Sequence, residues 1–532
     1  MASGTLTDEY ISILGADLVN TDPAALAAAA QTNYPTSQKI SLIVHPATTD
    51  QLSACLKLAA RRQHAVYVVS RGKNWGYGSK VPVKDGCVLI ELDRMNRILD
   101  YDEQLGYITV EPGVTFQQAF DFLREKNSTL LLGTTGGSTD SSIIGNVLER
   151  GIGTGLYADR FSYVCGMEVV LPDGSVIQTG FERFPNSATG KLSRWGMGPS
   201  LDGLFAQSNL GIVTRMTVWL LQSPEYFRIC FYKIDSTEKL AGVIDVLQRM
   251  AMEGLARPAL TLYNDLRVLS SVIQFPFNET QPGELDQDVL MEKIRAASPF
   301  GGMVGAWNGE ITIRAVSEAH ADIQSRLIEE RLQGLVYEFT SVSVDRTQIL
   351  DILKAHYTRE KQEPPTLTSF LLHKYIGIPT NAAIGQMYWR KRKPAPAVME
   401  PDKDRCGMLW FCPVIPFRGE DISKVVDILK RTAKKYALEA AISLQCLTER
   451  SIHIIASVNW DREVASEDEQ AVACYQETHR LLEEAGYYAY RNATLEMPEA
   501  VAADDYDRLL VRLKQAIDPG NILSPGKYIP SL

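Results

Sequence analysis

The stretch DGLFAQSNLGIVTRM, residues 202–216, is the most informative part of this sequence. Its pattern, D-G-L-F-x-Q-S-N-x-G-I-V-T, is long enough to be specific, whereas short glycine-rich turns are common in proteins. Three more stretches accompany it along the chain: RGKNWGYG (71–78), GGSTDSSIIGN (136–146) and DPGNILSPGK (518–527). We base the interpretation on the combination of all four.

Two of these stretches belong to longer loops of glycine and small residues, SRGKNWGYGS (70–79) and GTTGGSTDSSIIGN (133–146). Such residues let backbone N–H groups approach an anion, and successive amides form an anion-binding concavity. The first loop directly follows the strand-like AVYVV (65–69), the usual position of a phosphate cradle. It fits neither GxGxxG nor the P-loop consensus, which excludes a Rossmann or P-loop site. Taken alone, both loops would be read as surface turns.

The chain up to about residue 225 alternates strand-like and helical segments. Short β-branched runs predict strands, and apolar residues at helical spacing predict amphipathic helices. A hairpin is expected at GMEVVLPDGSVIQTG (166–180), where Asp173-Gly174 supplies a turn with positive φ. The expected strands are 40–44, 65–69, 87–92 and 107–113, and the expected helices are 51–62 and 115–126.

From about residue 226, long amphipathic helices alternate with strand-like segments such as GEITIRAV (309–316). Helices on one face of an antiparallel sheet would give an α+β layer. We therefore predict an α+β protein with an N-terminal unit (1–225), a middle unit (226–486) and a C-terminal segment (487–532) that returns to the first unit. The expected helices are Ser236–Glu253, Glu318–Leu332, Asp421–Tyr436 and Glu469–Ala485.

Composition excludes several classes of function. The 532 residues include 54 Lys and Arg against 64 Asp and Glu, a formal charge of −10. This disfavours a nucleic-acid binder, because phosphate neutralisation needs a basic surface. No apolar run approaches the roughly 18 residues that span a bilayer, and no secretory signal is visible. We expect a protein that engages neither nucleic acid nor a membrane.

The eight cysteines form neither a CxxC pair nor a Cys/His cluster, so no metal site is predicted. Most lie in apolar, strand-like sequence, which favours buried free thiols and a reducing, cytoplasmic location. They are Cys55, Cys87, Cys165, Cys230, Cys406, Cys412, Cys446 and Cys474.

Together, the four stretches resemble the flavin-binding family of vanillyl-alcohol oxidase and 4-cresol dehydrogenase. The resemblance runs from about residue 40 to residue 528 and is densest over 65–225 and at the C-terminal end. It implies a two-domain fold of the vanillyl-alcohol oxidase type. An FAD domain would form from the N-terminal half and the C-terminal segment, and a ferredoxin-like cap domain would cover the isoalloxazine.

By this resemblance, loop 70–79 holds the FAD pyrophosphate, loop 133–146 and ERGIGTGLY (149–157) run past the flavin, and the segment around Asn521 and Lys527 closes the site. The implied cofactor-binding residues are Arg71, Gly72, Lys73, Asn74, Trp75, Gly76, Gly136, Gly137, Ser138, Ser142, Gly145, Asn146, Gly151, Tyr157, Gly211, Ile212, Val213, Arg491 and Lys527.

The stretch GYYAYRNATLEMP (486–498) resembles the part of the family that carries an adjacent Tyr-Arg pair, here Tyr490 and Arg491. A second tyrosine, Tyr77, stands in NWGYG where these phenol oxidoreductases also have one. The resemblance implies that these three residues are catalytic. A para-substituted phenol releases a benzylic hydride readily only as the phenolate, and two hydroxyls and a guanidinium would stabilise that anion. Taken singly, Tyr77 and Tyr490 would be interpreted as ordinary aromatic packing, and Arg491 as a solvated charge.

Three more residues are implied at the substrate. Trp410, in CGMLWFCP (406–413), matches a ring-lining aromatic, and His453 matches a histidine close to the pocket. Thr154 stands where the family's ERGxGYTPYG motif has a tyrosine. Core packing is an equal alternative for Trp410, and a lone histidine in an apolar strand is more often structural.

The chain departs from the family pattern around the flavin. Where relatives attach FAD through a cap-domain histidine or tyrosine it has Met408, and where the wider fold often uses a histidine it has Asn74. We therefore predict FAD bound without a histidyl or tyrosyl link, with a thioether through the nearby Cys406 or Cys412 as an alternative. Where vanillyl-alcohol-oxidase-like members have an aspartate beside flavin N5 the chain has a glycine, Gly137, followed three residues later by Asp140.

The leading hypothesis is FAD-dependent oxidation of a 4-substituted phenol, by benzylic hydride transfer to flavin N5 through a quinone methide. Oxygen or a cytochrome-type protein would accept the electrons, and relatives are often homodimers. The departures at Met408, Asn74, Gly137 and Thr154 favour an alternative, a flavin-dependent biosynthetic oxidase or oxidative cyclase on a non-phenolic substrate. A third hypothesis, from another class, is a non-catalytic flavin-fold binding protein.

Overall fold

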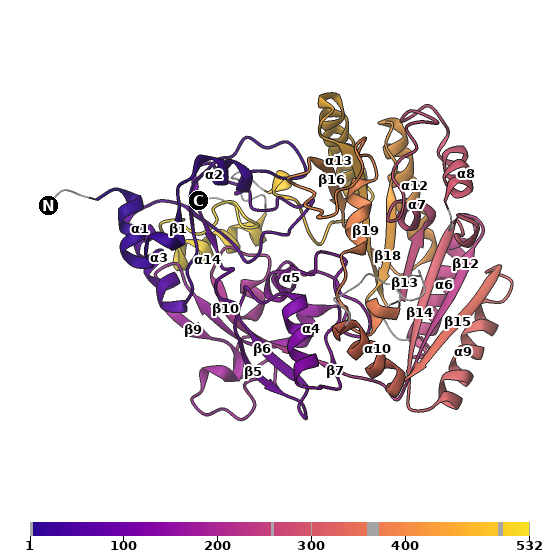
Figure 1. Ribbon diagram of the computed structural model, residues 1–532, viewed down its shortest axis with the longest axis horizontal. Helices are drawn as coiled ribbons and strands as arrows, with labels where there is room; N and C mark the ends of the chain where they lie inside the picture. Colours follow the sequence, from indigo (N-terminus) through magenta and orange to yellow (C-terminus); the bar gives the residue numbers. More distant parts are fainter. Residues whose placement is uncertain (1–3, 257–259, 299–300, 359–371, 498–503, 531–532) are drawn as a thin grey trace. The chain divides into compact units, whose positions relative to one another are not determined.

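The computed structural model divides into two compact units (Figure 1). The residues that the structure describes are 4–256, 260–298, 301–358, 372–497 and 504–530. Unit 1 comprises Met1–Gly153, Asp159–Gln222 and Ala493–Leu532, and unit 2 comprises Thr154–Ala158 and Ser223–Asn492. The domain assignment made from the sequence, with bounds after residues 225 and 486, stays a prediction.

The first sheet of unit 1 is a mixed sheet with helices on both faces. Its elements are β1 (Val19–Asn20), β2 (Ile40–Val44), β3 (Val66–Val69), β4 (Cys87–Glu91), α1 (Leu6–Leu14), α2 (Pro23–Ala29) and α3 (Thr49–Arg62). The order is β1-β2-β4-β3, with β2, β4 and β3 parallel and β1 antiparallel to β2. Alternate side chains of β2 face opposite ways, so Leu42 packs with α3 and Ile43 packs with Ala29 of α2.

The second sheet of unit 1 is antiparallel. Its strands are β5 (Ile98–Asp102), β6 (Tyr107–Val110), β8 (Val164–Val170), β9 (Val176–Gln178) and β10 (Ile212–Trp219), accompanied by α4 (Phe116–Glu125), α5 (Ile143–Leu148) and the pair β7 (Leu130–Leu131) and β11 (Leu221–Gln222). The order is β5-β6-β10-β8-β9. Gly174 has a φ of 81° between β8 and β9, which confirms the expected hairpin. The specific stretch 202–216 thus leads into the central strand of this sheet.

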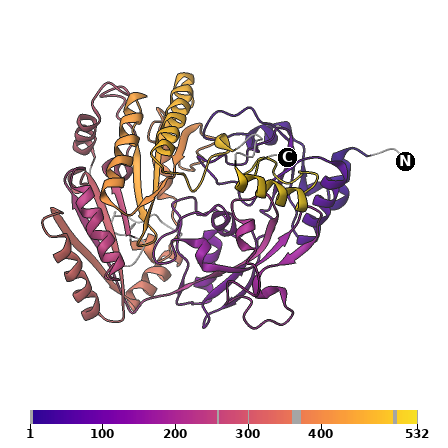
Figure 2. The ribbon, with the colours of Figure 1, turned by 180° about the vertical axis from the view of Figure 1, so that it is seen from behind.

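The C-terminal segment of the chain packs within unit 1. It comprises a short 3-10 turn, η7 (Thr494–Glu496), helix α14 (Asp505–Ile517) and the loop that follows. The Val66 N–H donates to the Ile522 carbonyl (2.8 Å) and the Ser524 N–H to the Val66 carbonyl (2.7 Å), so the segment lies along β3. In both views the yellow end of the chain lies among the indigo and purple elements (Figure 1 and Figure 2).

The buried Lys514 connects the C-terminal segment to the stretch 202–216, which leads into strand β10. The Lys514 ammonium is fully buried and forms an ion pair with Asp518 (2.7 Å). It also donates to the carbonyls of Asn209 (2.7 Å) and Leu523 (2.9 Å). The Asn209 amide in turn donates to the Ser524 carbonyl (3.1 Å). Two of the four motif stretches, 202–216 and 518–527, are therefore held together in unit 1.

Unit 2 is built on one antiparallel sheet. Its strands are β12 (Tyr226–Ile234), β13 (Leu260–Asn264), β14 (Trp307–Ala315), β15 (Glu338–Asp345), β16 (Cys406–Phe411), β17 (Val414–Pro416), β18 (Ala441–Cys446) and β19 (Ser451–Asp461). Its helices are α6 (Leu240–Met252), α7 (Asp265–Leu269), α8 (Gln287–Ala297), α9 (Glu318–Leu332), α10 (Arg346–Thr358), α12 (Gly419–Lys435) and α13 (Ala465–Glu484), with a 3-10 helix η6 (Ala382–Tyr388). The strand order is β15-β12-β14-β13-β18-β19-β16, and β17 also pairs with β19.

One face of this sheet is apolar and carries the long helices α6, α9, α12 and α13. In β14, Trp307, Ile311 and Ile313 are almost completely buried on this face. The Trp460 indole N–H of β19 donates to Asp468 of α13 (2.6 Å). The four helices expected between residues 236 and 485 are confirmed, with ends shifted by a few residues.

Two expectations from composition can be compared with the structure. All eight cysteines are buried thiols. Within the described ranges, no helix has both the length and the apolar character that a membrane crossing requires.

Candidate cofactor and substrate site

The two glycine-rich loops of unit 1 lie side by side. The Arg71 Nε–H donates to the Asp140 carbonyl (3.4 Å). A β-carbon at Gly145 would lie 3.3 Å from the Ser70 hydroxyl, which is close to the limit of ordinary contact. Although they are separated in sequence, loops 70–79 and 133–146 therefore form one surface.

The residues on this surface fit a dinucleotide with two phosphates. Arg71 and Lys73 bring two cations to the first loop, and a β-carbon at Gly136 in the second would meet nothing within 4 Å. Among the described residues, buried side-chain oxygens of Asn146 in the second loop, and of Asn209 and Asn521 elsewhere in unit 1, have no hydrogen-bond partner. Amide oxygens accept N–H donors, and a buried acceptor without a partner is costly, so these positions suit the polar edge of a ligand.

Other predicted cofactor residues are held by contacts within unit 1. The Ser142 hydroxyl donates to the Pro112 carbonyl (2.6 Å) and accepts from the Gly145 N–H (2.9 Å). Lys527 pairs with Glu149 (2.8 Å), which also accepts from the Tyr528 hydroxyl (2.8 Å). Trp75, Ser138, Ile212 and Val213 are buried, and β-carbons at Gly151 and Gly211 would overlap their neighbours. These facts describe the framework of the loops, and the cofactor contacts of these residues stay predictions.

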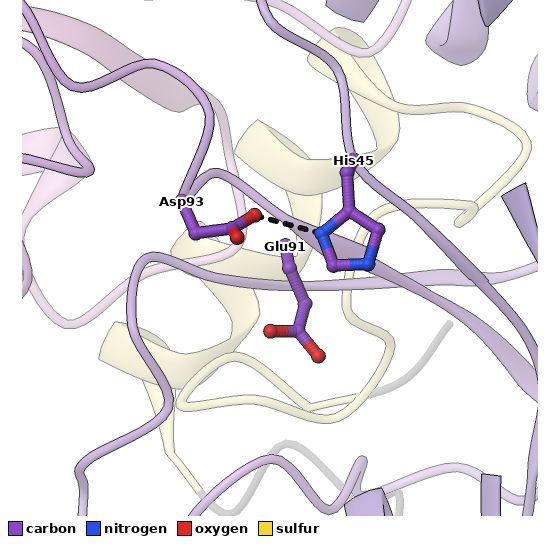
Figure 3. A group of neighbouring side chains, drawn as sticks. All are labelled: His45, Glu91 and Asp93. Carbon is purple, nitrogen blue, oxygen red and sulfur yellow. Dashed lines mark hydrogen bonds and ion pairs between the residues drawn. The ribbon is translucent and has the colours of Figure 1, made fainter. Parts of the chain in front are cut away.

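One group in unit 1 has the composition of a metal site. Single ligand atoms of His45, Glu91 and Asp93 all lie within 4.8 Å of one another (Figure 3). His45 Nδ1 lies 2.7 Å from Asp93, however, and Glu91 pairs with Lys80 at 2.7 Å. Because each carboxylate already faces a protein donor, we assign no metal to this group.

The predicted Tyr490 and His453 come together in unit 2. Their rings lie 4.9 Å apart at an angle of 54°. The Tyr490 N–H donates to the Cys412 carbonyl (3.0 Å), which fixes this tyrosine beside the sheet. Burial raises the pKa of Tyr490 well above its usual range, so its hydroxyl stays protonated and can donate a hydrogen bond.

Trp410 and His453 lie on the same face of the unit 2 sheet, opposite the face with the long helices. Trp410 stands opposite Ser457 of β19, four residues beyond His453, and side chains two residues apart in a strand point the same way. One row across this face is polar and runs through Glu310, Thr261, Gln445 and His453. We call it the polar face of the sheet.

A buried ionic cluster on the polar face was not predicted from the sequence. Lys374 Nζ pairs with Glu310 (2.9 Å) and donates to the Tyr263 hydroxyl (2.8 Å), while the Tyr375 hydroxyl donates to Glu310. Although burial alone would lower it, the Glu310 carboxylate raises the pKa of Lys374 well above its usual range. The signal in the sequence was the alternation of polar and apolar residues in NGEITIRA (308–315), which is also typical of a solvent-facing strand.

The remaining predicted residues fall on both units. Thr154 donates through its hydroxyl to the Lys374 carbonyl (3.0 Å) in unit 2. Met408, Cys406 and Cys412 are buried in unit 2, and burial raises the pKa of the Cys406 thiol. Asp140 is exposed in unit 1.

Tyr77 is buried in unit 1, whereas Tyr490 and Arg491 belong to unit 2. Their assembly into one site stays a prediction.

The chain is similar to proteins of known name over nearly its whole length. A family model described as an FAD binding domain matches residues 40–180. The chain is 37% identical to a 1'-carboxy-chondrochloren decarboxylase of Chondromyces crocatus over 529 residues, 98% of this chain and 96% of that protein. It is 29% identical to the 4-cresol dehydrogenase [hydroxylating] flavoprotein subunit of Pseudomonas putida, over 92% of this chain and 87% of that protein.

The fold is also that of a solved structure, p-cresol methylhydroxylase with substrate bound. The two superpose with a TM-score of 0.84 at 27% identity, and the match covers 99% of this chain and 96% of the other. The predicted fold class, the FAD cofactor and the resemblance of the four stretches are thereby confirmed. The chain belongs to the vanillyl-alcohol oxidase and p-cresol methylhydroxylase family of FAD-dependent oxidoreductases.

Proposed function

We propose that this oxidoreductase acts on a 4-substituted phenol and that Tyr77, Tyr490 and Arg491 bind the phenolate oxygen. The observation that best supports this proposal is the position of Tyr490, a half-buried tyrosine whose ring lies 4.9 Å from that of His453. A protonated tyrosine can donate to a phenolate, and the adjacent Arg491 brings the positive charge that the anion needs.

The residues that would hold FAD are those of loops 70–79 and 133–146, with Lys527 at the C-terminal end. FAD, when bound, supplies the acceptor for a hydride from the benzylic carbon. The protein residues hold the phenol as its anion and orient the benzylic carbon. A charge pair at 4 Å is worth about 4 kcal/mol at an effective dielectric near 20. This corresponds to lowering the phenol pKa by about 3 at most, before desolvation is subtracted.

The direct test is to mix the purified, FAD-loaded enzyme with 4-ethylphenol or vanillyl alcohol under anaerobic conditions and follow the flavin absorbance. We expect bleaching with a para-alkylphenol and none with an alkylbenzene of the same shape. If oxygen is the electron acceptor, air admitted afterwards should reoxidise the flavin and restore its absorbance. If a cytochrome-type protein is required, the flavin should stay bleached in air. Absence of bleaching with every para-alkylphenol tried removes the proposal.

A matched pair of glycine substitutions tests the cofactor loop. Gly72 (φ +66°) and Gly86 (φ +74°) both have a positive φ that disfavours other residues. A β-carbon at Gly72 would lie 2.5 Å from the Lys80 side chain, whereas a β-carbon at Gly86 would meet nothing within 4 Å. We expect Gly72→Ala to weaken FAD binding about 10-fold and Gly86→Ala to leave it within about 2-fold, measured by FAD titration of the apoprotein. Equal effects of the two substitutions would contradict the assignment of loop 70–79.

A second candidate function is oxidative decarboxylation, favoured by the 37% identical relative that is named a carboxy-chondrochloren decarboxylase. If the substrate carries a carboxylate on the carbon next to the benzylic carbon, loss of the benzylic hydride from the phenolate leaves a quinone methide. The electron pair of the bond to the carboxylate then forms a carbon–carbon double bond, carbon dioxide leaves, and the phenolate is restored. The products are a 4-hydroxystyrene and carbon dioxide, which separate this outcome from hydroxylation.

We also infer a cytoplasmic location from the eight buried thiols, because reducing compartments preserve such groups. A fractionation experiment that finds the protein outside the cytoplasm contradicts this. The family's common homodimer is likewise a proposal, and light scattering of the purified enzyme measures it directly.

A further inference from the structure

An arginine of unit 2, Arg267, lies on the polar face of the sheet. It is the third residue of the short helix α7, directly after β13. Its Nε–H donates to the Ser443 hydroxyl on β18 (3.1 Å). Among the described residues, no carboxylate lies within ion-pair distance of its guanidinium and no other group accepts from its side chain. The nearby Asp265 pairs instead with Arg295.

A half-buried guanidinium without a counter-ion among the described residues is unusual. Interior charges are normally paired, because the cost of removing them from water is several kcal/mol. Burial lowers the pKa of Arg267 to about 10, which expresses this cost, yet the group stays charged near neutral pH. A guanidinium offers five N–H donors, and within the described part of the chain only one of them donates, so the group presents a planar fork suited to a carboxylate.

The other charges of the polar face do not supply the missing anion. Glu310 is the nearest carboxylate in the row across the sheet, and it is already occupied by Lys374 and Tyr375. Tyr263 lies next to Arg267, but burial raises its pKa, so it stays a neutral phenol. Arg267 is therefore positioned toward an anion that comes from outside the described chain.

The register of the sheet links Arg267 to the predicted phenol-binding residue Tyr490 through Ser443 and His453. His453 of β19 stands opposite Gln445 of β18, and Ser443 is two residues away on β18, on the same face. Diagonal neighbours of this kind lie about 7–8 Å apart. His453 contacts the ring of Tyr490. His453 is thus a diagonal neighbour of Ser443 and a contact of Tyr490, so it connects the two positions on the polar face.

We propose that Arg267, with the Ser443 hydroxyl, binds a carboxylate on the side chain of a 4-hydroxyphenyl substrate whose phenolate lies at Tyr490 and Arg491. This inference rests on the proposed function and narrows it to phenols whose side chain carries an anionic group. Arg267 is then a specificity-determining residue. It also holds the carboxylate of the decarboxylation candidate in a fixed orientation relative to the ring.

The experiment compares two probes that differ only in the carboxylate, 3-(4-hydroxyphenyl)propionate and 4-propylphenol, with the FAD-loaded enzyme. Binding is measured by calorimetry and turnover by kcat/KM. We expect the natural enzyme to bind the carboxylate probe at least 10-fold more tightly. Arg267→Gln should weaken binding of that probe about 10- to 100-fold and change binding of 4-propylphenol by less than about 2-fold. Arg267→Lys, which keeps the charge, should restore part of the difference.

A control variant of the same residue type separates this effect from damage to the fold. Arg228 of β12 is largely buried and pairs with Asp322 (2.6 Å) on the helix-bearing side of the sheet. We expect Arg228→Gln to leave the ratio between the two probes unchanged.

The proposal is overturned if Arg267→Gln weakens both probes equally, or if the natural enzyme shows no preference for the carboxylate. If neither probe is oxidised but the carboxylate preference persists and depends on Arg267, the proposed phenol oxidation fails while the carboxylate site stands.

Discussion

Replacing Arg491 with alanine should lower kcat/KM for a 4-alkylphenol by about 10³-fold at pH 7. A single donor that stabilises a developing oxyanion is typically worth 10²–10³-fold, and the guanidinium adds a full positive charge. The loss should appear mainly in the rate of flavin reduction under anaerobic conditions, which stopped-flow absorbance measures directly. A loss confined to KM would assign Arg491 to simple ground-state binding.

The pH dependence of the Arg491→Ala variant distinguishes a phenolate mechanism from a non-phenolic one. Without the guanidinium, the substrate must ionise with its own pKa, near 10 for a phenol. The rate of the variant should therefore rise toward pH 10, and the deficit relative to the natural enzyme should shrink there. Arg491→Lys, which retains a charge, should lie between the two. A variant that reacts as fast as the natural enzyme at pH 7 would favour the non-phenolic biosynthetic oxidase.

The second large effect concerns stability, and it follows from the burial of Lys514. We expect Lys514→Met to destabilise unit 1 by about 3–5 kcal/mol, because the change leaves Asp518 buried without its partner. The carbonyls of Asn209 and Leu523 lose their donor as well. In a unit of this size the change corresponds to a melting temperature lower by roughly 10 °C, which calorimetry of the FAD-loaded protein detects.

Helix α14 offers a matched control for this prediction. Arg508 pairs with Asp505 on the same helix, but both side chains are exposed. Such surface pairs contribute about 0–1 kcal/mol, so Arg508→Gln should shift the melting temperature by no more than about 2 °C. Similar shifts for the two variants would show that the buried lysine has no special role in holding the C-terminal segment.

The elements that sequence predicted well are those set by local patterning. Helix Glu318–Leu332 was placed without error because its apolar residues recur at helical spacing. The hairpin around Gly174 was fixed by a turn that demands positive φ. The family resemblance came from the combination of four stretches, of which 202–216 is long enough to be specific. In the structure this stretch runs into the central strand β10.

The residues that sequence missed are those whose meaning depends on distant partners. In the sequence NGEITIRA, Glu310 has the pattern of an exposed strand residue. Its contacts with Lys374 and Tyr375, which are distant in sequence, make it part of a buried cluster. The local sequence around Arg267 does not single it out. The proposed role depends on the observation that no described carboxylate pairs with its guanidinium. His453, by contrast, was predicted, but only through the family resemblance, because its contact with Tyr490 depends on a segment that follows some 35 residues later.

The C-terminal segment that lies along β3 constrains how the protein is made in the cell. The N-terminal part of unit 1 leaves the ribosome long before its closing segment, because Ser223–Asn492 must be synthesised in between. At about 5–20 residues per second, this interval lasts on the order of 10–60 s. During that time the nascent β3 has an open edge, a potential site of mispairing that molecular chaperones commonly shield. Unit 1 is therefore completed only after its last segment, Ala493–Leu532, has been synthesised.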